Sequence, residues 1–98
     1  MILNKHIQDN NIENIYDSSH ILASKYNTIS QKLAIIFKNG AQYLYHDVKI
    51  TDYELFENSD SQGKVINSTI KKYKTEKVDG KIDVTPILEQ IQTFKNNI

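Results

Sequence analysis

The sequence predicts an α+β fold: a three- to five-stranded antiparallel meander with two short helices packed on it and a C-terminal helix. Two apolar-rich segments flank Asn39-Gly40, the dipeptide that most strongly favours a tight hairpin turn. Apolar residues at helical spacing begin only after residue 50, so the strands precede the helices. The length of 98 residues fits a single domain over 1–98.

The first half of the chain contains the predicted strands. Residues 1–17 mix polar and apolar positions without a clear period, and we expect a short strand or helix before a turn at 9–11. Residues 19–26, 32–38 and 41–48 each favour a strand, because β-branched and aromatic residues recur in them. These three strands form the predicted meander.

The hairpin turn predicts the strand register. A two-residue loop at Asn39-Gly40 pairs Phe37 with Gln42. One face would then carry Leu33, Ile35, Phe37, Leu44, His46 and Val48. The opposite face would carry Ala34, Ile36, Tyr43 and Tyr45. Both faces are substantially apolar, so we expect helices on the first and a terminal extension, a partner chain or a ligand on the second. Left uncovered, the second face would be a large apolar patch, which favours a homo-oligomer.

Helix signals follow the meander. Thr51 and Glu54 match a capping box at the start of a short helix that should end near Asn58. Tyr53 and Phe56 lie three residues apart and therefore share one face of this helix.

Two further helices are predicted in the last third of the chain. The first runs from about Lys64 to Tyr73. A turn at 78–81 then falls inside a hairpin. Thr85 is a suitable N-cap with Pro86 at the first helical position, which predicts a last helix. Its buried stripe would be Ile87, Leu88, Ile91 and Phe94.

A series of residues in the middle of the chain resembles a known family. In chain order they are Ser18-Ser19-His20-Ile21, Tyr26, Leu33, Ile35, Phe37, Gly40, Tyr43, Tyr45, Val48, Tyr53, Leu55, Ser61, Gly63, Asn67, Ile70 and Tyr73. Their types and spacings are similar to those of the KTSC domain, a small module found at the C-terminus of some lysyl-tRNA synthetases and alone in bacterial and phage proteins. Lys49 stands where the family often has proline. The resemblance implies a compact α+β core over 18–73, with extensions at 1–17 and 75–98, and no established chemistry.

The composition limits the classes of function. The chain has 12 acidic and 12 basic residues, and every basic residue is lysine. This balance excludes a protein that coats nucleic acid, and without arginine an anion site must use lysine, hydroxyl or backbone N–H groups. The absence of cysteine excludes a disulfide framework, a thiolate metal site and a cysteine nucleophile. With no apolar run of about 20 residues and no secretory signal, we expect a cytoplasmic protein without membrane contact.

The loop before the second predicted helix is the strongest candidate for a ligand site. Ser59 and Ser61 offer hydroxyl groups, Gly63 permits a close approach of the backbone, and Lys64 supplies positive charge. A helix start also presents unpaired N–H groups, which together with these side chains could bind a phosphate. The alternative is that Asp60 or Ser61 only caps the helix.

Other candidate residues extend this site. Tyr43 and Tyr45 could stack on a nucleobase, although packing in a small core is the alternative for most of the tyrosines. The full candidate set is Ser18, Ser19, Tyr43, Tyr45, Ser59, Ser61, Gly63, Lys64, Asn67 and Lys71. The three histidines lack metal-binding spacing and no nucleophile–base pair is evident, so we expect neither a metal, a cofactor nor catalysis.

The preferred interpretation is a non-enzymatic binding protein for a phosphate-bearing ligand, such as a nucleotide. One form of it would be a phage-encoded anti-defence protein that sequesters a nucleotide immune signal. The alternative is an accessory module that contacts protein or RNA and has no small-molecule ligand, as the synthetase association of the similar family suggests.

Overall fold

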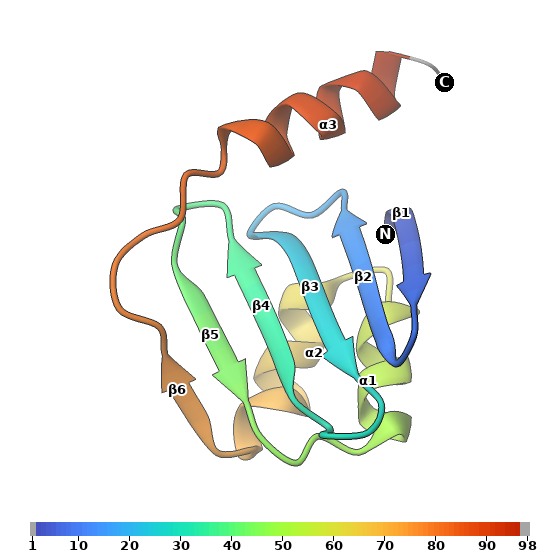
Figure 1. Cartoon of the computed structure of the whole chain (residues 1–98), viewed down its shortest axis with the longest axis vertical. Helices are drawn as coiled ribbons and strands as arrows, with labels where there is room; N and C mark the ends of the chain where they lie inside the picture. The colour runs from blue at the N-terminus through green and yellow to red at the C-terminus, as the bar shows by residue number, and fades with distance from the viewer. Residues whose placement is uncertain (1, 97–98) are drawn as a thin grey trace.

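A computed structural model describes residues 2–96 and shows one six-stranded antiparallel sheet, with the strands side by side in chain order (Figure 1). The strands are β1 (Ile2–Gln8), β2 (Asn11–Tyr16), β3 (Ile21–Asn27), β4 (Leu33–Phe37), β5 (Gln42–Tyr45) and β6 (Thr75–Lys77). The α+β class and the antiparallel meander are confirmed. The predicted strand number is wrong: the predicted meander corresponds to β3, β4 and β5, and β1 and β2 at one edge with β6 at the other bring the sheet to six strands.

The two edge strands, β1 and β6, lack the burial pattern that would reveal them in a sequence. β1 and β2 form a hairpin through the turn at Asp9, which has a positive φ of 55°. From Asn4 onward the side chains of β1 are exposed, and all three side chains of β6 are exposed. An edge strand that buries no face shows no apolar alternation, so hydrogen bonding to a neighbour is what defines it.

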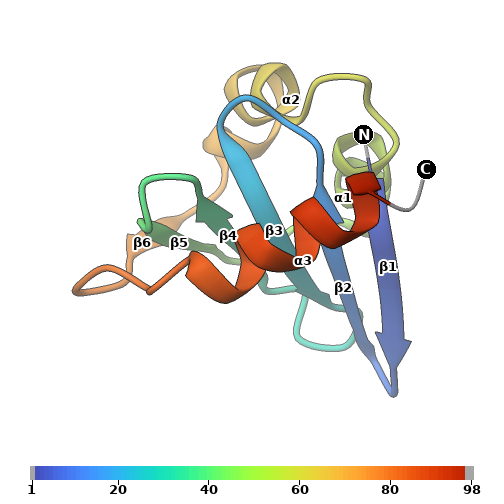
Figure 2. The ribbon, with the colours of Figure 1, turned by 90° about the horizontal axis from the view of Figure 1, so that it is seen from above.

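Helices cover both faces of the sheet (Figure 2). On one face lie α1 (Ile50–Glu57), α2 (Gln62–Ser68) and the 3-10 helix η1 (Ile70–Lys72); α3 (Thr85–Asn96) crosses the opposite face. None of the helices in the described chain is long and apolar enough to cross a membrane.

The main core lies between the sheet and the pair α1 and α2. The rings of Tyr26 and Tyr53 stack with centroids 4.2 Å apart, and the Tyr26 hydroxyl donates to the carbonyl of Val48. Tyr16 meets Phe56 edge-on at 5.5 Å. These aromatic pairs join the centre of the sheet to α1, and they confirm that Tyr53 and Phe56 share the buried face of that helix.

The β4–β5 hairpin differs from the prediction by one residue. Its loop comprises residues 38–40, because the Phe37 N–H donates to the Ala41 carbonyl at 2.9 Å. Gly40 has a φ of 87°, which suits a three-residue loop that ends in a left-handed glycine. Ile35 therefore pairs with Tyr43, and Leu33 with Tyr45.

This shift reverses the side chains of β5. Tyr43 and Tyr45 lie on the core face, and the predicted tyrosine-bearing second face is wrong. The second face carries Ala34 and Ile36 on β4 instead, and Ile87 of α3 faces them across a cavity. Because a helix of the same chain crosses this face, the apolar patch that favoured a homo-oligomer is partly covered.

α3 rests on the sheet without close burial. Ile87, Ile91 and Phe94 are half-buried, whereas Leu88 is 45% exposed, so its place in the predicted stripe is wrong. The carboxylate of Asp83 accepts from the N–H of residue 85 at 3.0 Å, which places a capping side chain two residues before the start predicted from the sequence.

Both ends of α3 are tied to loops at one end of the sheet. Just before the helix, the Ile82 N–H donates to the Gly40 carbonyl at 2.9 Å. In its last turn, the Lys95 ammonium lies 3.2 Å from the Asp17 carboxylate. The helix therefore spans from the β4–β5 loop to the β2–β3 loop.

Three other predicted helix and turn features are wrong. α1 is preceded by Lys49 and has no side-chain cap, so Thr51 lies inside the helix and makes no capping box. The predicted helix over 64–73 starts earlier, after its N-cap Ser61, and breaks at Thr69 into α2 and η1. The turn at Gly80 is present with a φ of 76°, but the chain after it leads to α3 and forms no second strand.

Candidate ligand-binding site

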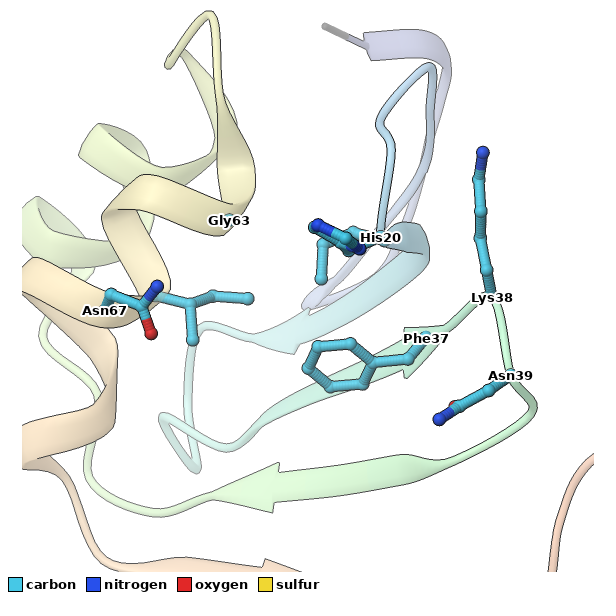
Figure 3. Close-up of a pocket in the computed structure, with 8 residues that line it drawn as sticks. His20, Phe37, Lys38, Asn39, Gly63 and Asn67 are labelled. Atoms are coloured by element: carbon cyan, nitrogen blue, oxygen red, sulfur yellow. The ribbon is translucent and has the colours of Figure 1, made fainter.

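A cavity of about 340 Å³ lies between the start of β3, the end of β4 and α2 (Figure 3). Its lining residues are His20, Ile21, Phe37, Lys38, Asn39, Gly63, Ile66 and Asn67. They come from three separate parts of the chain, which the sheet register and the packing of α2 bring together. The volume falls within the range of small-ligand pockets, about 300–1,000 Å³.

Hydrogen bonds from backbone N–H groups fix the two loops on the sheet side of the cavity. The hydroxyl of Ser18 accepts from the N–H groups of His20 and Ile21 at 3.4 and 3.3 Å, which bends the chain into β3. The Lys38 N–H donates to the His20 carbonyl at 2.9 Å. The side chains of His20 and Lys38 are therefore held on neighbouring segments at the same end of the sheet.

Asn39 completes the turn on this side. Its Oδ1 accepts from the Ala41 N–H at 2.9 Å. This bond occupies the oxygen, and the nitrogen of Asn39 points into the cavity in Figure 3. Asn39 thus stabilises the loop and offers a hydrogen-bond donor to a ligand.

The opposite wall is α2. Gly63 faces His20 closely, because a Cβ added at Gly63 would lie 3.9 Å from His20 Cδ2. Asn67 is one turn further along and is exposed to solvent at the mouth of the cavity. The helix side therefore contributes backbone surface, one amide side chain and the apolar side chain of Ile66.

The hydroxyl groups of Ser59 and Ser61, in the loop before α2, make their hydrogen bonds within that loop and the first turn of the helix. Ser61 is the N-cap and accepts from the Lys64 N–H, while the Ser59 hydroxyl donates to the Ser61 carbonyl and accepts from its N–H, each at 3.0 Å. These contacts match the capping alternative that the sequence left open. Neither serine lines the cavity.

The predicted candidate residues thus divide into three groups. Gly63 and Asn67 line the cavity, and Ser18 positions its sheet side, next to the exposed Ser19. The second group neither lines the cavity nor positions its sheet side, and it comprises Ser59, Ser61, Lys64 and Lys71. Tyr45 is buried, and Tyr43 packs edge-on against Phe37 at 5.4 Å. The two tyrosines are held in the sheet, so their prediction as an exposed stacking face is wrong.

The predicted candidate set contains none of the other lining residues, namely His20, Ile21, Phe37, Lys38, Asn39 and Ile66. The sequence places Lys38 and Asn39 at a turn, and His20 and Phe37 in the family pattern, without indicating a ligand contact. Their proximity follows from the pairing of Ile21 with Phe37. A prediction of the β3–β4 register would have revealed the site, because that register places the β2–β3 loop beside the β4–β5 loop.

The lining suits a ligand with an apolar part and an anionic part. Ile21, Phe37 and Ile66 supply the apolar surface, while Lys38 and His20 are the groups able to carry positive charge. Among the residues that the structure describes, no carboxylate lines the cavity. Within the described part of the chain, no group of three or more histidine or carboxylate side chains could hold a metal ion.

A separate cluster of polar side chains lies between β1, β2 and α1, and all of its members except Lys5 are buried. Glu57 accepts hydrogen bonds of 2.8 Å from Lys5, Asn14 and Tyr53. Burial alone would raise the pKa of the Glu57 carboxyl, but these hydrogen bonds outweigh it and hold that pKa below its usual range. Burial raises the pKa of the neighbouring Tyr16 to about 12. The cluster contains one ion pair, between Lys5 and Glu57, and it anchors α1 to the N-terminal hairpin.

Comparisons with known proteins identify the central part of the chain. Residues 17–73 match the model of the KTSC domain. Among solved structures, the chain is similar to the KTSC domain protein YPO2434 from Yersinia pestis, with 26% sequence identity and a TM-score of 0.65; the alignment covers 69% of this chain and 97% of that chain. A comparison with curated proteins found no match. All the residues that line the cavity lie inside the matched range, whereas α3 lies outside it.

Proposed function

The chain belongs to the KTSC domain family, and we propose that it is a non-enzymatic binding protein for a small phosphate-bearing ligand, held in the cavity beside α2. The observation that carries this proposal is the composition of the cavity lining. It combines apolar side chains with His20 and Lys38 and contains no carboxylate.

A nucleotide fits this lining better than a simple anion. A nucleobase can bury its flat surface against Phe37 and Ile66, since aromatic and aliphatic side chains accept any base. The phosphate would then lie near Lys38 and His20 at the mouth. Amide groups from Asn39 and Asn67 supply the hydrogen bonds that fix orientation, as in most small-molecule sites.

A binding protein of this kind acts by occupancy and needs no reaction. We therefore extend the proposal to a cytoplasmic protein that sequesters a nucleotide signal, with a phage-encoded anti-defence role as its most specific form. The arginine-free composition supports a pocket-sized anion over a long polyanion, because arginine is the usual residue for bidentate contacts to nucleic acid.

The second candidate is a module that contacts RNA or protein through the surface outside the cavity. Its support is a group of exposed lysines on and beside α2 and η1, namely Lys64, Lys71, Lys72 and Lys74. RNA binding through this surface would weaken steeply as salt concentration rises, because it releases counterions. A small ligand in an apolar cavity would show a shallower dependence on salt.

Isothermal titration calorimetry with cyclic and linear nucleotides tests the proposal. We expect saturable binding by the unaltered chain and a loss of about tenfold or more in affinity for Lys38→Ala, since hydrogen bonds to charged groups contribute roughly 1.5–3 kcal/mol. Lys71→Ala is the matched control, because it removes an exposed lysine outside the cavity.

The possible outcomes separate the candidates. The absence of heat with every nucleotide would contradict the proposal. A larger effect of Lys71→Ala than of Lys38→Ala would move the anion site to the helix surface predicted from the sequence. Binding of single-stranded RNA that falls sharply between 50 and 200 mM salt would favour the second candidate.

A further inference from the structure

A second cavity, of about 380 Å³, lies under α3 on the opposite face of the sheet from α1 and α2. Ile15, Ala23, Ala34 and Ile36 form its apolar floor, and Ile87 and Gln90 of α3 lie above them. The sheet separates this cavity from the one beside α2. Because α3 follows the matched range 17–73, the second cavity depends on a part of the chain that the family model does not include.

Small side chains create the hollow. Ala23 and Ala34 lie on the adjacent strands β3 and β4, and the register places them diagonally on one face. A helix packed on a sheet usually interdigitates with it, and voids larger than a water molecule are few in protein interiors. Here α3 has no fully buried side chain, so its apolar residues do not fill the space above the alanines. The layer between α3 and the sheet is therefore incomplete.

The charges around the cavity compensate one another. Glu13 and Lys25 both line it, and their charged groups lie 3.7 Å apart. An anionic ligand would meet the carboxylate and a cationic ligand the ammonium. The remaining polar contacts include the amides of Gln42 and Gln90, which can both donate and accept hydrogen bonds. This lining favours a ligand without net charge.

From this geometry we propose that the space between α3 and the sheet is a binding site for a neutral, flat, mostly apolar small molecule. Such a molecule would bury one side on the alanine floor and the other against Ile87, completing the layer that the side chains leave open. The burial of apolar surface on both sides of the molecule would drive its binding. The proposal concerns a different face and a different ligand class from the nucleotide site.

Nile red, a neutral and planar fluorescent dye, is the probe for this site. We expect titration of the full chain to give a saturable rise in emission with one dye per chain. Ile87→Ala removes a lining side chain and should weaken binding by at least fivefold. Leu88→Ala makes a comparable truncation at the next residue, which is 45% exposed, and should change the affinity less than twofold.

A filling variant gives the opposite test. Ala34→Leu places three more carbon atoms in the cavity and should reduce dye affinity by at least tenfold, provided that circular dichroism shows an unaltered fold. Methyl chemical shifts of Ala23 and Ala34 in the unaltered chain give a second readout that needs no variant. We expect both to move on dye addition.

Four results would overturn the proposal. The first three are unchanged dye affinity in a folded Ala34→Leu variant, equal effects of Ile87→Ala and Leu88→Ala, and unmoved alanine methyl signals in the presence of saturating dye. A dye signal that follows chain association, seen as a dependence on protein concentration, would assign the surface to a second copy and would also overturn it. His20→Ala should leave dye binding intact, so failure here is distinct from failure at the nucleotide site.

Discussion

Gly40 and Ile82 meet through their backbones: the Ile82 N–H donates to the Gly40 carbonyl at 2.9 Å, and a Cβ added at Gly40 would lie 2.8 Å from the Ile82 carbonyl oxygen. Gly40 also has a φ of 87°, so both its conformation and its neighbour exclude a side chain. The contact joins the β4–β5 loop, which borders the candidate site, to the segment that leads into α3.

Substitution of this glycine should be markedly destabilising. Gly40→Ala combines a strained left-handed residue, at roughly 1–3 kcal/mol, with a backbone clash. Gly80→Ala is the matched control, because Gly80 has a similar φ of 76° but nothing within 4 Å of an added Cβ. We expect Gly40→Ala to lower the free energy of unfolding, measured in urea, by at least about 1 kcal/mol more than Gly80→Ala. Equal losses would contradict the role of Ile82.

The hydroxyl of Tyr53 should contribute to stability through the buried polar cluster. It donates to Glu57 at 2.8 Å and accepts from Asn14 at 2.9 Å. Tyr53→Phe removes both contacts, while Glu57 and Asn14 keep each other as partners. The loss of the hydrogen bond to the Glu57 carboxylate should cost about 1.5–3 kcal/mol. Tyr43→Phe is the control, because the Tyr43 hydroxyl makes no hydrogen bond to the described residues. Thermal unfolding followed by circular dichroism should show a lower Tm for Tyr53→Phe alone. An equal fall in Tm for both variants would contradict a stabilising role of the cluster.

The depressed pKa of Glu57 predicts a dependence of stability on acid pH. The folded-state pKa lies below the ordinary value of 4.5, so the stabilisation is fully present above that value and is lost as pH falls through the folded-state pKa. Glu57→Gln removes this titration. We expect the variant to be less stable at pH 7 and the gap between the two proteins to narrow from pH 5 to pH 3. A constant gap over that range would show that Glu57 has the same pKa folded and unfolded.

Removal of α3 should leave the remaining fold intact. The helix has no fully buried residue, whereas the main core lies on the other face of the sheet. A chain ending after Asp83 should retain a cooperative unfolding transition with a lower Tm, and it should lose Nile red binding. Nucleotide binding in the cavity beside α2 should persist, because the contact of Ile82 with Gly40 remains. Its affinity should change, because the pair of Lys95 with Asp17 is lost. Loss of cooperative unfolding would show that α3 is part of the core.

Much of the central fold could be predicted because burial imposes a period on the sequence. β3 and β4 alternate or run apolar between turn residues, and Tyr53 and Phe56 mark the buried face of α1. The exposed side chains of the edge strands carry no such pattern. For this reason the sequence predicted only a strand or a helix where β1 lies, and it did not predict β6.

The candidate site was predicted only in part, and the reason is the register. Gly63 was predicted from the loop before the second helix and Asn67 belongs to the family pattern, and both line the cavity. His20 and Lys38 were not, because they are brought together by the pairing of two strands rather than by spacing along one element. A single extra loop residue at 38–40 then reversed β5, and this moved Tyr43 and Tyr45 from the expected ligand face to the core.

Contacts at both ends of α3 connect the two faces of the sheet. Ile82 holds the loop that carries Lys38, and Lys95 pairs with Asp17, three residues before His20. If a molecule inserted under α3 moved this helix, the distance between the side chains of His20 and Lys38 on the other side would change. Thermodynamic reciprocity would then require that a ligand bound beside α2 alter the affinity of the second site by the same factor, so occupancy on one face of the sheet would be reported on the other.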